Sequence, residues 1–280
     1  MLGDTYKHLF DSRRICAAAL LAMLAALGPW GACSAAEPPL PPDSGQADQP
    51  HLWLPMDHKV LPHLADSTEW KTTIWLVNLD SAPAEYRLRF YQSGGAPLSL
   101  QLVGVGTVSE VSGTLPVNGM RRLETAGTSA TLSVGFAILE RLNGKAINGY
   151  GIFRQHLPER PYDFEAVAPF ASDLDDDYVL PFDNSAGFTT SMAICNPSAS
   201  SSATVDVVFY NDAGTPIGQE QLTLNPREHT AFATDVRWPA TIGQRGVAVF
   251  RVSGGGTGAP VLSLRFNWTG PFTSTHTLSR

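Results

Sequence analysis

The sequence is poor in charge and in cysteine. Charged residues make up 16% of the 280 residues, well below the roughly 25% usual for soluble globular domains, and the formal net charge is −7. A chain with few cations and an acidic balance lacks the basic face that nucleic-acid phosphates require, so no nucleic-acid partner is expected. Two of the three cysteines, Cys16 and Cys33, lie near the N-terminus. The third, Cys195 in the apolar stretch SMAIC, is predicted to be a small buried hydrophobe.

Catalytic signatures are missing as well. The sequence contains neither G-x-S-x-G nor H-E-x-x-H, which are typical of serine hydrolases and zinc peptidases. Pairing one of the many turn serines with His156, His229 or His276 would be arbitrary. We therefore predict a protein that is not an enzyme and has no cofactor. The alternative is a carbohydrate-active or other hydrolytic enzyme, or an accessory protein, that uses loops not shared between the two halves.

The long apolar run near the N-terminus is too short to span a bilayer. Basic residues precede this run, ICAAALLAMLAAL (15–27), and the small residues SAA follow it at 34–36. This is the pattern of a cleaved signal peptide, so residues 1–36 predict export to the periplasm, the cell surface or the medium. The stretch WGAC, which ends at Cys33, leaves a lipid anchor as an alternative. Residues 37–54 are Pro-rich and polar, as in an extended tether.

The sequence does contain an internal repeat. VLPHLADSTEWKTTIWLVN (60–78) is echoed by VLPFDNSAGFTTSMAICN (179–196), and YRLRFYQSGGAPL (86–98) is echoed by VDVVFYNDAGTPI (205–217). An internal duplication explains the echo. The predicted organisation is therefore a first repeat over 55–157, an acidic linker over 158–177 and a second repeat over 178–280.

The repeated stretches are predicted to be β-strands. EYRLRFY alternates apolar and charged residues, which is the period of a half-buried strand, and turn signals such as NDAGTP separate the runs. Each repeat is therefore predicted to be an antiparallel β-sandwich, and the whole chain an all-β protein of two tandem immunoglobulin-like domains. The arrangement resembles the immunoglobulin-like and fibronectin-like sandwiches of uncharacterised secreted bacterial proteins with two such copies. The resemblance covers roughly residues 55–280, and it implies export and no catalytic residues.

Clustered carboxylates at the junction of the repeats form one candidate metal site. Asp173, Asp175 and Asp177 follow a D-x-D-x-D pattern, and a hard cation such as Ca²⁺ prefers oxygen ligands. Tyr178 stands where the sharp turn of an EF-hand loop needs glycine. Two interpretations follow: a calcium-stiffened linker in an adhesive rod, or a solvated acidic linker.

A second group of metal-ligating residue types lies in the lead-in to the first repeat. It contains His51, His58 and His63, with aspartates nearby. Their spacing matches no zinc motif. We expect these histidines to be exposed.

Two tryptophans are candidates for a binding surface. Trp238 and Trp268 have no aromatic counterpart in the first repeat, and aromatic side chains outside a shared core can stack on sugars or fill a partner's pocket. Packing under a loop is the other interpretation for both. The sequence thus predicts an exported module that binds a protein or a glycan, or acts as a structural spacer.

Overall fold

The computed structural model describes residues 58–171, 177–254, 258–275 and 277–279. These residues form an all-β protein, as the strand patterns predicted. The helical turns among them are α2 (Thr234–Arg237) and η2 (Pro239–Thr241). Within this part of the chain, no helix has the length and apolarity that a membrane span needs. The predicted signal peptide, the tether and Cys33 lie outside the described residues.

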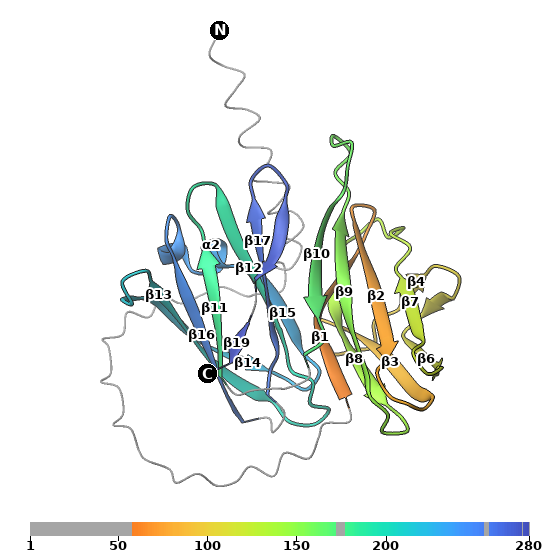
Figure 1. Ribbon diagram of the computed structural model, residues 1–280. Coiled ribbons are helices and arrows are strands. Elements are labelled where there is room, and N and C mark those ends of the chain that lie inside the picture. The colour runs from red at the N-terminus through yellow and green to blue at the C-terminus, as the bar shows by residue number, and fades with distance from the viewer. Residues whose placement is uncertain (1–57, 172–176, 255–257, 276, 280) are drawn as a thin grey trace.

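The first half of the described chain forms two antiparallel four-stranded sheets (Figure 1). Sheet I has the order β1-β8-β3-β6 and sheet II the order β10-β9-β2-β7. A two-stranded hairpin, β4–β5, follows β3. The bounds are β1 His58–Asp66, β2 Trp70–Asn78, β3 Ala84–Gln92, β4 Leu100–Leu102, β5 Gly106–Val108, β6 Glu110–Leu115, β7 Met120–Glu124, β8 Ser133–Arg141, β9 Ile147–Gln155 and β10 Phe164–Pro169.

The second half forms two further antiparallel sheets. Sheet III has the order β15-β12-β17-β18, and sheet IV has the order β14-β13-β16-β11-β19. The bounds are β11 Asp177–Asp183, β12 Phe188–Cys195, β13 Ala203–Asn211, β14 Pro216–Leu224, β15 His229–Ala233, β16 Arg245–Gly254, β17 Val261–Asn267, β18 Phe272–Thr275 and β19 Leu278–Ser279.

The strand order of the first half recurs in the second. Sheet I (β1-β8-β3-β6) corresponds to β11-β16-β13-β14 of sheet IV, and sheet II (β10-β9-β2-β7) corresponds to β18-β17-β12-β15 of sheet III. The echoed stretches fall on corresponding strands, with 60–78 on β1 and β2 and 179–196 on β11 and β12. The repeated sequence pattern therefore specifies the same strand pairing twice.

The hydrophobic core is not divided between the two halves. One cluster joins Leu88 of sheet I and Leu76 of sheet II to Leu264 and Phe266 of sheet III. A second cluster fills the space between sheets III and IV, with Phe209 among its members. Sheet III therefore contributes to both clusters.

The prediction of two tandem immunoglobulin-like β-sandwiches, each with its own interior and laid end to end, is wrong. The four sheets form a propeller-like ring of four small blades, and residues of the second half complete the core of the first. The resemblance to immunoglobulin-like and fibronectin-like domains fails for the same reason. A repeated pattern reports strand order and inward-facing residues, but it does not report which outer faces another sheet covers.

Burial along the strands shows which sheet faces are covered. In β3, buried positions alternate with more exposed ones, because one face of the strand meets the core and the other meets solvent. In β12, the last six residues are all buried, as expected for a strand covered on both faces. The continuous apolar run SMAIC is the sequence signature of that double coverage.

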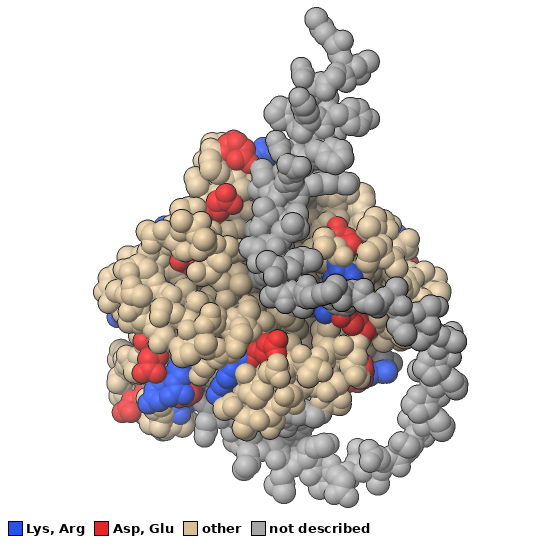
Figure 2. Space-filling view, turned by 180° about the vertical axis from the view of Figure 1, so that it is seen from behind, with Lys and Arg blue, Asp and Glu red and all other residues tan. Residues whose placement is uncertain are grey.

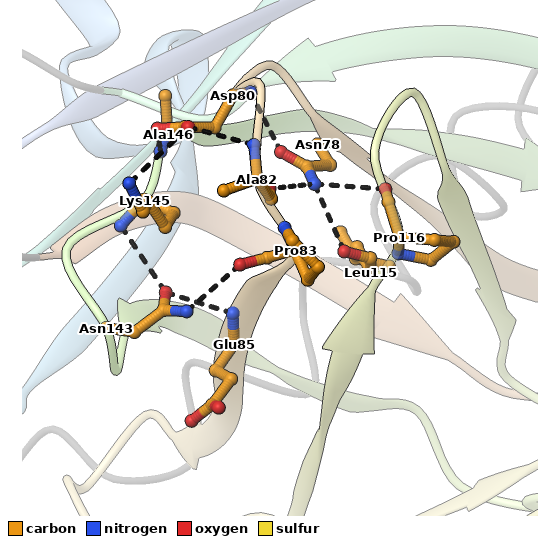
Figure 3. Close-up of polar contacts among 10 residues, drawn as sticks. All are labelled: Asn78, Asp80, Ala82, Pro83, Glu85, Leu115, Pro116, Asn143, Lys145 and Ala146. Carbon is orange, nitrogen blue, oxygen red and sulfur yellow. Dashed lines mark hydrogen bonds and ion pairs between the residues drawn. The ribbon is translucent and has the colours of Figure 1, made fainter.

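A buried asparagine fixes the chain where β2 ends (Figure 3). The side-chain nitrogen of Asn78 donates to the carbonyl oxygens of Ala82, Leu115 and Pro116 at 2.9, 3.1 and 2.9 Å. Its side-chain oxygen accepts from the backbone N–H of Asp80 at 2.8 Å. One side chain thus satisfies carbonyls of two separate turns that would otherwise be buried without donors.

Asn196 does the same at the end of β12. Its side-chain nitrogen donates to the carbonyls of Ser201, Leu224 and Asn225 at 2.8, 3.0 and 3.1 Å, and its oxygen accepts from the N–H of Ser198 at 3.0 Å. The pairing of Asn78 with Asn196 in the sequence thus marks a structural residue in each half.

We expect Asn78→Ala to lower the free energy of unfolding by about 1 to 3 kcal/mol, because it leaves buried carbonyls without donors. Asn143→Ala is the matched control. Asn143 also bridges backbone groups, those of Pro83 and Glu85, but it is exposed, so its loss should cost no more than about 0.5 kcal/mol. Urea denaturation of both variants checks this, and equal losses would contradict the structural role of Asn78.

Candidate functional site

The outward face of sheet II carries aromatic and aliphatic side chains. We call it the aromatic face. At its centre lies a cross-strand row in which Pro169 of β10, Tyr150 of β9, Trp75 of β2 and Arg122 of β7 are direct neighbours. Figure 1 shows these four strands side by side. The alternation of β2 creates this face, since Trp70 and Ile74 point into the core and Trp75 therefore points out.

The next row along the strands extends the apolar area. Val167, Ile152 and Thr73 are neighbours across β10, β9 and β2. Val167 is 47% exposed and Tyr150 is 38% exposed, so apolar surface is open to solvent there. The guanidinium of Arg122 lies over the Trp75 ring, 5.9 Å from its centroid.

The outward face of sheet I has a different character. Arg89 donates to Glu140 at 2.7 Å and also contacts Glu110 at 3.4 Å, while Arg87 lies 3.8 Å from Glu140. Ion pairs of this kind are usual on a sheet surface that faces solvent. On the face shown in Figure 2, charged atoms likewise form small mixed groups among uncharged residues.

The counterpart of the aromatic face in the second half is buried. By strand register, Ala193 corresponds to Trp75, Leu262 to Tyr150 and Leu264 to Ile152. Leu262 and Leu264 belong to the core cluster of the first half. The same side of the repeated sheet is thus an internal packing surface in sheet III, whereas in sheet II no other sheet of the described residues covers it.

A hydrogen-bonded chain of three side chains joins the two halves where sheet III packs on β1. His63 Nδ1 lies 3.0 Å from His229 Nε2, and the two rings stack with centroids 5.2 Å apart. On its other side, His229 Nδ1 lies 3.1 Å from Ser93 Oγ. The backbone N–H of His229 also donates to the carbonyl of Ser93 at 3.0 Å. The β3–β4 turn is thereby tied to β15.

Both histidines are held in the neutral form. Burial lowers the pKa of His63 from 6.5 to about 4. Burial also lowers the pKa of His229 well below its ordinary value, and charge repulsion with His63 lowers it further. A proton on either ring would place a cation in an apolar junction, with the second imidazole as its nearest polar neighbour.

Two backbone features shape the same junction. A Cβ at Gly95 would lie 2.9 Å from the carbonyl oxygen of Pro226, so only glycine lets the β3–β4 turn approach the β14–β15 turn this closely. Arg227 adopts φ 61°, which is unusual for a side chain of its size. Its guanidinium lies 5.0 Å from the centroid of the Tyr91 ring in the first half. The strained backbone of Arg227 therefore lies at the contact between the two halves.

An apolar cavity of about 50 Å³ lies beside His63, between sheets of the two halves. At about 10–15 Å³ for each water molecule, it has room for only a few waters and not for a sugar ring. Ser93 is not among its lining residues, which are His63, Ala65, Trp70, Leu132, Val134, Phe153, Ser191, Met192, Ala193, Ala231, Leu262, Leu264 and Phe266. The cavity therefore offers no access to the hydroxyl next to His229.

The two tryptophans singled out in the sequence have different environments. Trp238 is 7% exposed and packs between Phe209 and Phe232, with ring centroids 4.6 and 5.0 Å away. Trp268 is 53% exposed in the turn after β17 and lies against Gly187. Trp238 is thus placed in the core and Trp268 on the surface.

The metal candidates are only partly described. Asp173 and Asp175 lie outside the described residues, and Asp177 begins β11 opposite Arg251. Among the residues that the structure does describe, no cluster of three or more histidine, cysteine, aspartate or glutamate side chains could hold a metal ion. The calcium site stays a prediction.

The histidines of the lead-in do not behave as one group. His51 is outside the described residues, and His58 begins β1. His63 was expected to be exposed, but it is partly buried and contacts His229. Cys195 is completely buried, as predicted, and burial raises the pKa of its thiol well above the ordinary value. It is an inert core residue.

Sequence reasoning missed Trp75, Tyr150 and the pairing of His63 with His229. The alternation of TTIWLV around the inward Ile74 was a usable signal for an outward tryptophan. No sequence signal links His63 to His229, because 166 positions separate them.

No protein-family model matches this chain, and neither a curated protein nor a solved structure shows significant similarity to it.

We expect Trp238→Ala to lower the free energy of unfolding by about 3 to 5 kcal/mol, because it leaves a cavity between two phenylalanines. Trp268→Ala is the matched aromatic control and should cost less than about 1 kcal/mol, since the side chain is more than half exposed. Urea denaturation measures both, and a small loss for Trp238→Ala would contradict its core position.

Acid should destabilise the protein through the histidine pair. The unfolded chain binds protons at a pKa near 6.5 while folded His63 does so only near 4, so stability is complete above about pH 6.5 and falls as pH drops towards 4. The expected loss is about 1 to 3 kcal/mol. Urea midpoints at pH 7.5, 6.0 and 4.5 measure it.

His63→Gln should flatten this pH dependence, because it removes one of the two buried imidazoles. An identical pH profile for the wild type and His63→Gln would show that the pair is not the source.

Proposed function

We propose that this protein is an exported, non-catalytic module that binds a protein partner through the aromatic face of sheet II. The observation that carries the proposal is the row of Trp75, Tyr150 and Arg122 on a face that no other sheet of the described residues covers. Tryptophan, tyrosine and arginine are the residue types that dominate binding energy at protein interfaces. Support for export comes from the signal-peptide pattern of residues 1–36.

The surroundings of Trp75 favour a protein over a glycan. A sugar stacks on a free aromatic face, but Arg122 already lies over the Trp75 ring. Ile152 and Val167 add aliphatic surface beside it, and a mixture of aromatic, aliphatic and arginine side chains is typical of the centre of a protein interface.

The geometry gives less support to a hydrolytic enzyme. Ser93, His229 and His63 follow the order of a nucleophile, a base and an orienting group. However, His229 is only 2% exposed, and Ser93 does not line the neighbouring cavity. The three residues are better explained as a polar link between the halves.

A photo-crosslinking amino acid at position 150 tests the proposal in cells that produce the protein. We expect covalent adducts with protein at position 150 and none at position 268. Trp268 is the matched control because it is an exposed aromatic residue in the turn after β17, on a different sheet from position 150. Equal crosslinking at the two positions, or glycan-array binding that Trp75→Ala abolishes, would contradict a protein-binding role for the aromatic face.

A further inference from the structure

The partner of the aromatic face can be inferred from the way charge is arranged around its apolar centre. The strand register determines which outward-facing residues are neighbours in each row across the sheet. Glu165, Arg154 and Lys71 form one border row across β10, β9 and β2. Along β7, the edge strand of the face, Arg122 and Glu124 form an ion pair with each other. Each border therefore contains both signs of charge.

We infer that the aromatic face binds the same face of a second copy of this chain about a two-fold axis. This inference rests on the proposed binding role of the face. An axis that runs diagonally across the four strands places Arg122 of each copy opposite Glu165 of the other. The same axis places Lys71 opposite Glu124. A two-fold interface is self-complementary by symmetry, so each pair occurs twice.

The apolar residues fit the same arrangement. The diagonal axis brings Trp75 and Tyr150 of one copy over Val167 and Pro169 of the other, which are exposed. A diagonal two-fold makes the strands of the two sheets cross at nearly a right angle. Orthogonal packing is one of the two arrangements that face-to-face sheets adopt.

Head-to-tail association, in which a second copy would repeat the internal docking of sheet III, has no open receiving surface among the described residues. In the first half, sheet III packs beside β1 and against Phe153. In the second half, the corresponding strand β11 is paired with β19 along that side. Arg265, which corresponds to Phe153, donates to Asp183 at 2.6 Å. The equivalent surface is thus closed by a strand and an ion pair.

The size of the face predicts a weak dimer. Four strands about 4.8 Å apart and three rows about 7 Å apart cover roughly 14 by 14 Å, less than the roughly 800 Å² that each partner buries in a standard interface. We therefore expect association that depends on protein concentration in the micromolar range.

Sedimentation velocity of the purified mature chain over a concentration series tests the dimer. We expect the wild type to approach the mass of two chains as concentration rises. Arg122→Glu and Glu165→Arg should each weaken dimerisation at least about tenfold, because each creates two like-charge contacts. An equimolar mixture of the two variants should dimerise again, because the heterodimer restores opposite charges at both contacts.

Arg121→Glu is the matched control, because Arg121 is the neighbouring residue of β7 and the alternation of the strand directs it to the other face. It should dimerise like the wild type. Circular dichroism of every variant separates loss of the contact from loss of the fold.

A wild type that stays monomeric, or two variants that remain monomeric when mixed, overturns the inference. A monomeric wild type that still crosslinks at position 150 to a different protein overturns the second copy as partner but leaves the proposed function standing. Absence of both dimer and crosslinks contradicts both proposals.

Discussion

Coverage of sheet III on both sides is the constraint on which the rest of the structure depends. Met192 and Ile194 of β12 pack into the core shared with sheet IV, while Leu262 and Leu264 of β17 complete the core of the first half. Removing such apolar area from water is the main favourable term in folding. The first half therefore depends on residues of the second to complete its core, whereas the cluster between sheets III and IV is built from second-half residues.

This shared interior explains where polar groups and backbone strain collect. His63, His229 and Ser93 satisfy one another where water is excluded between β1 and β15, because a buried polar group without a partner is costly. Arg227 tolerates an unfavourable backbone conformation at the same junction. The aromatic face, by contrast, is covered by no other sheet of the described residues, and Tyr150 and Val167 are exposed there.

Much of the local structure follows from particular residues. The echo of Asn78 in Asn196 predicted equivalent strand ends, and both side chains make the same set of backbone hydrogen bonds. The apolar run around Cys195 predicted burial. Trp238 was a candidate for a binding surface but lies in the core, because an isolated tryptophan carries no period that tells a core position from a surface position. The partnership of His63 and His229 could not be predicted, since it depends on how two distant strands pack.

The sequence by itself determined that the chain is built from strands, that one strand order occurs twice and that asparagine closes the same turn in each half. These are local matters of alternation, turn chemistry and hydrogen bonding, which a short stretch of residues specifies. Only the tertiary structure decided that sheet III would be buried on both faces and sheet II on one. That outcome depends on the packing of apolar surfaces far apart in the chain, because the hydrophobic effect has no direction and rewards whichever arrangement removes most apolar area from water.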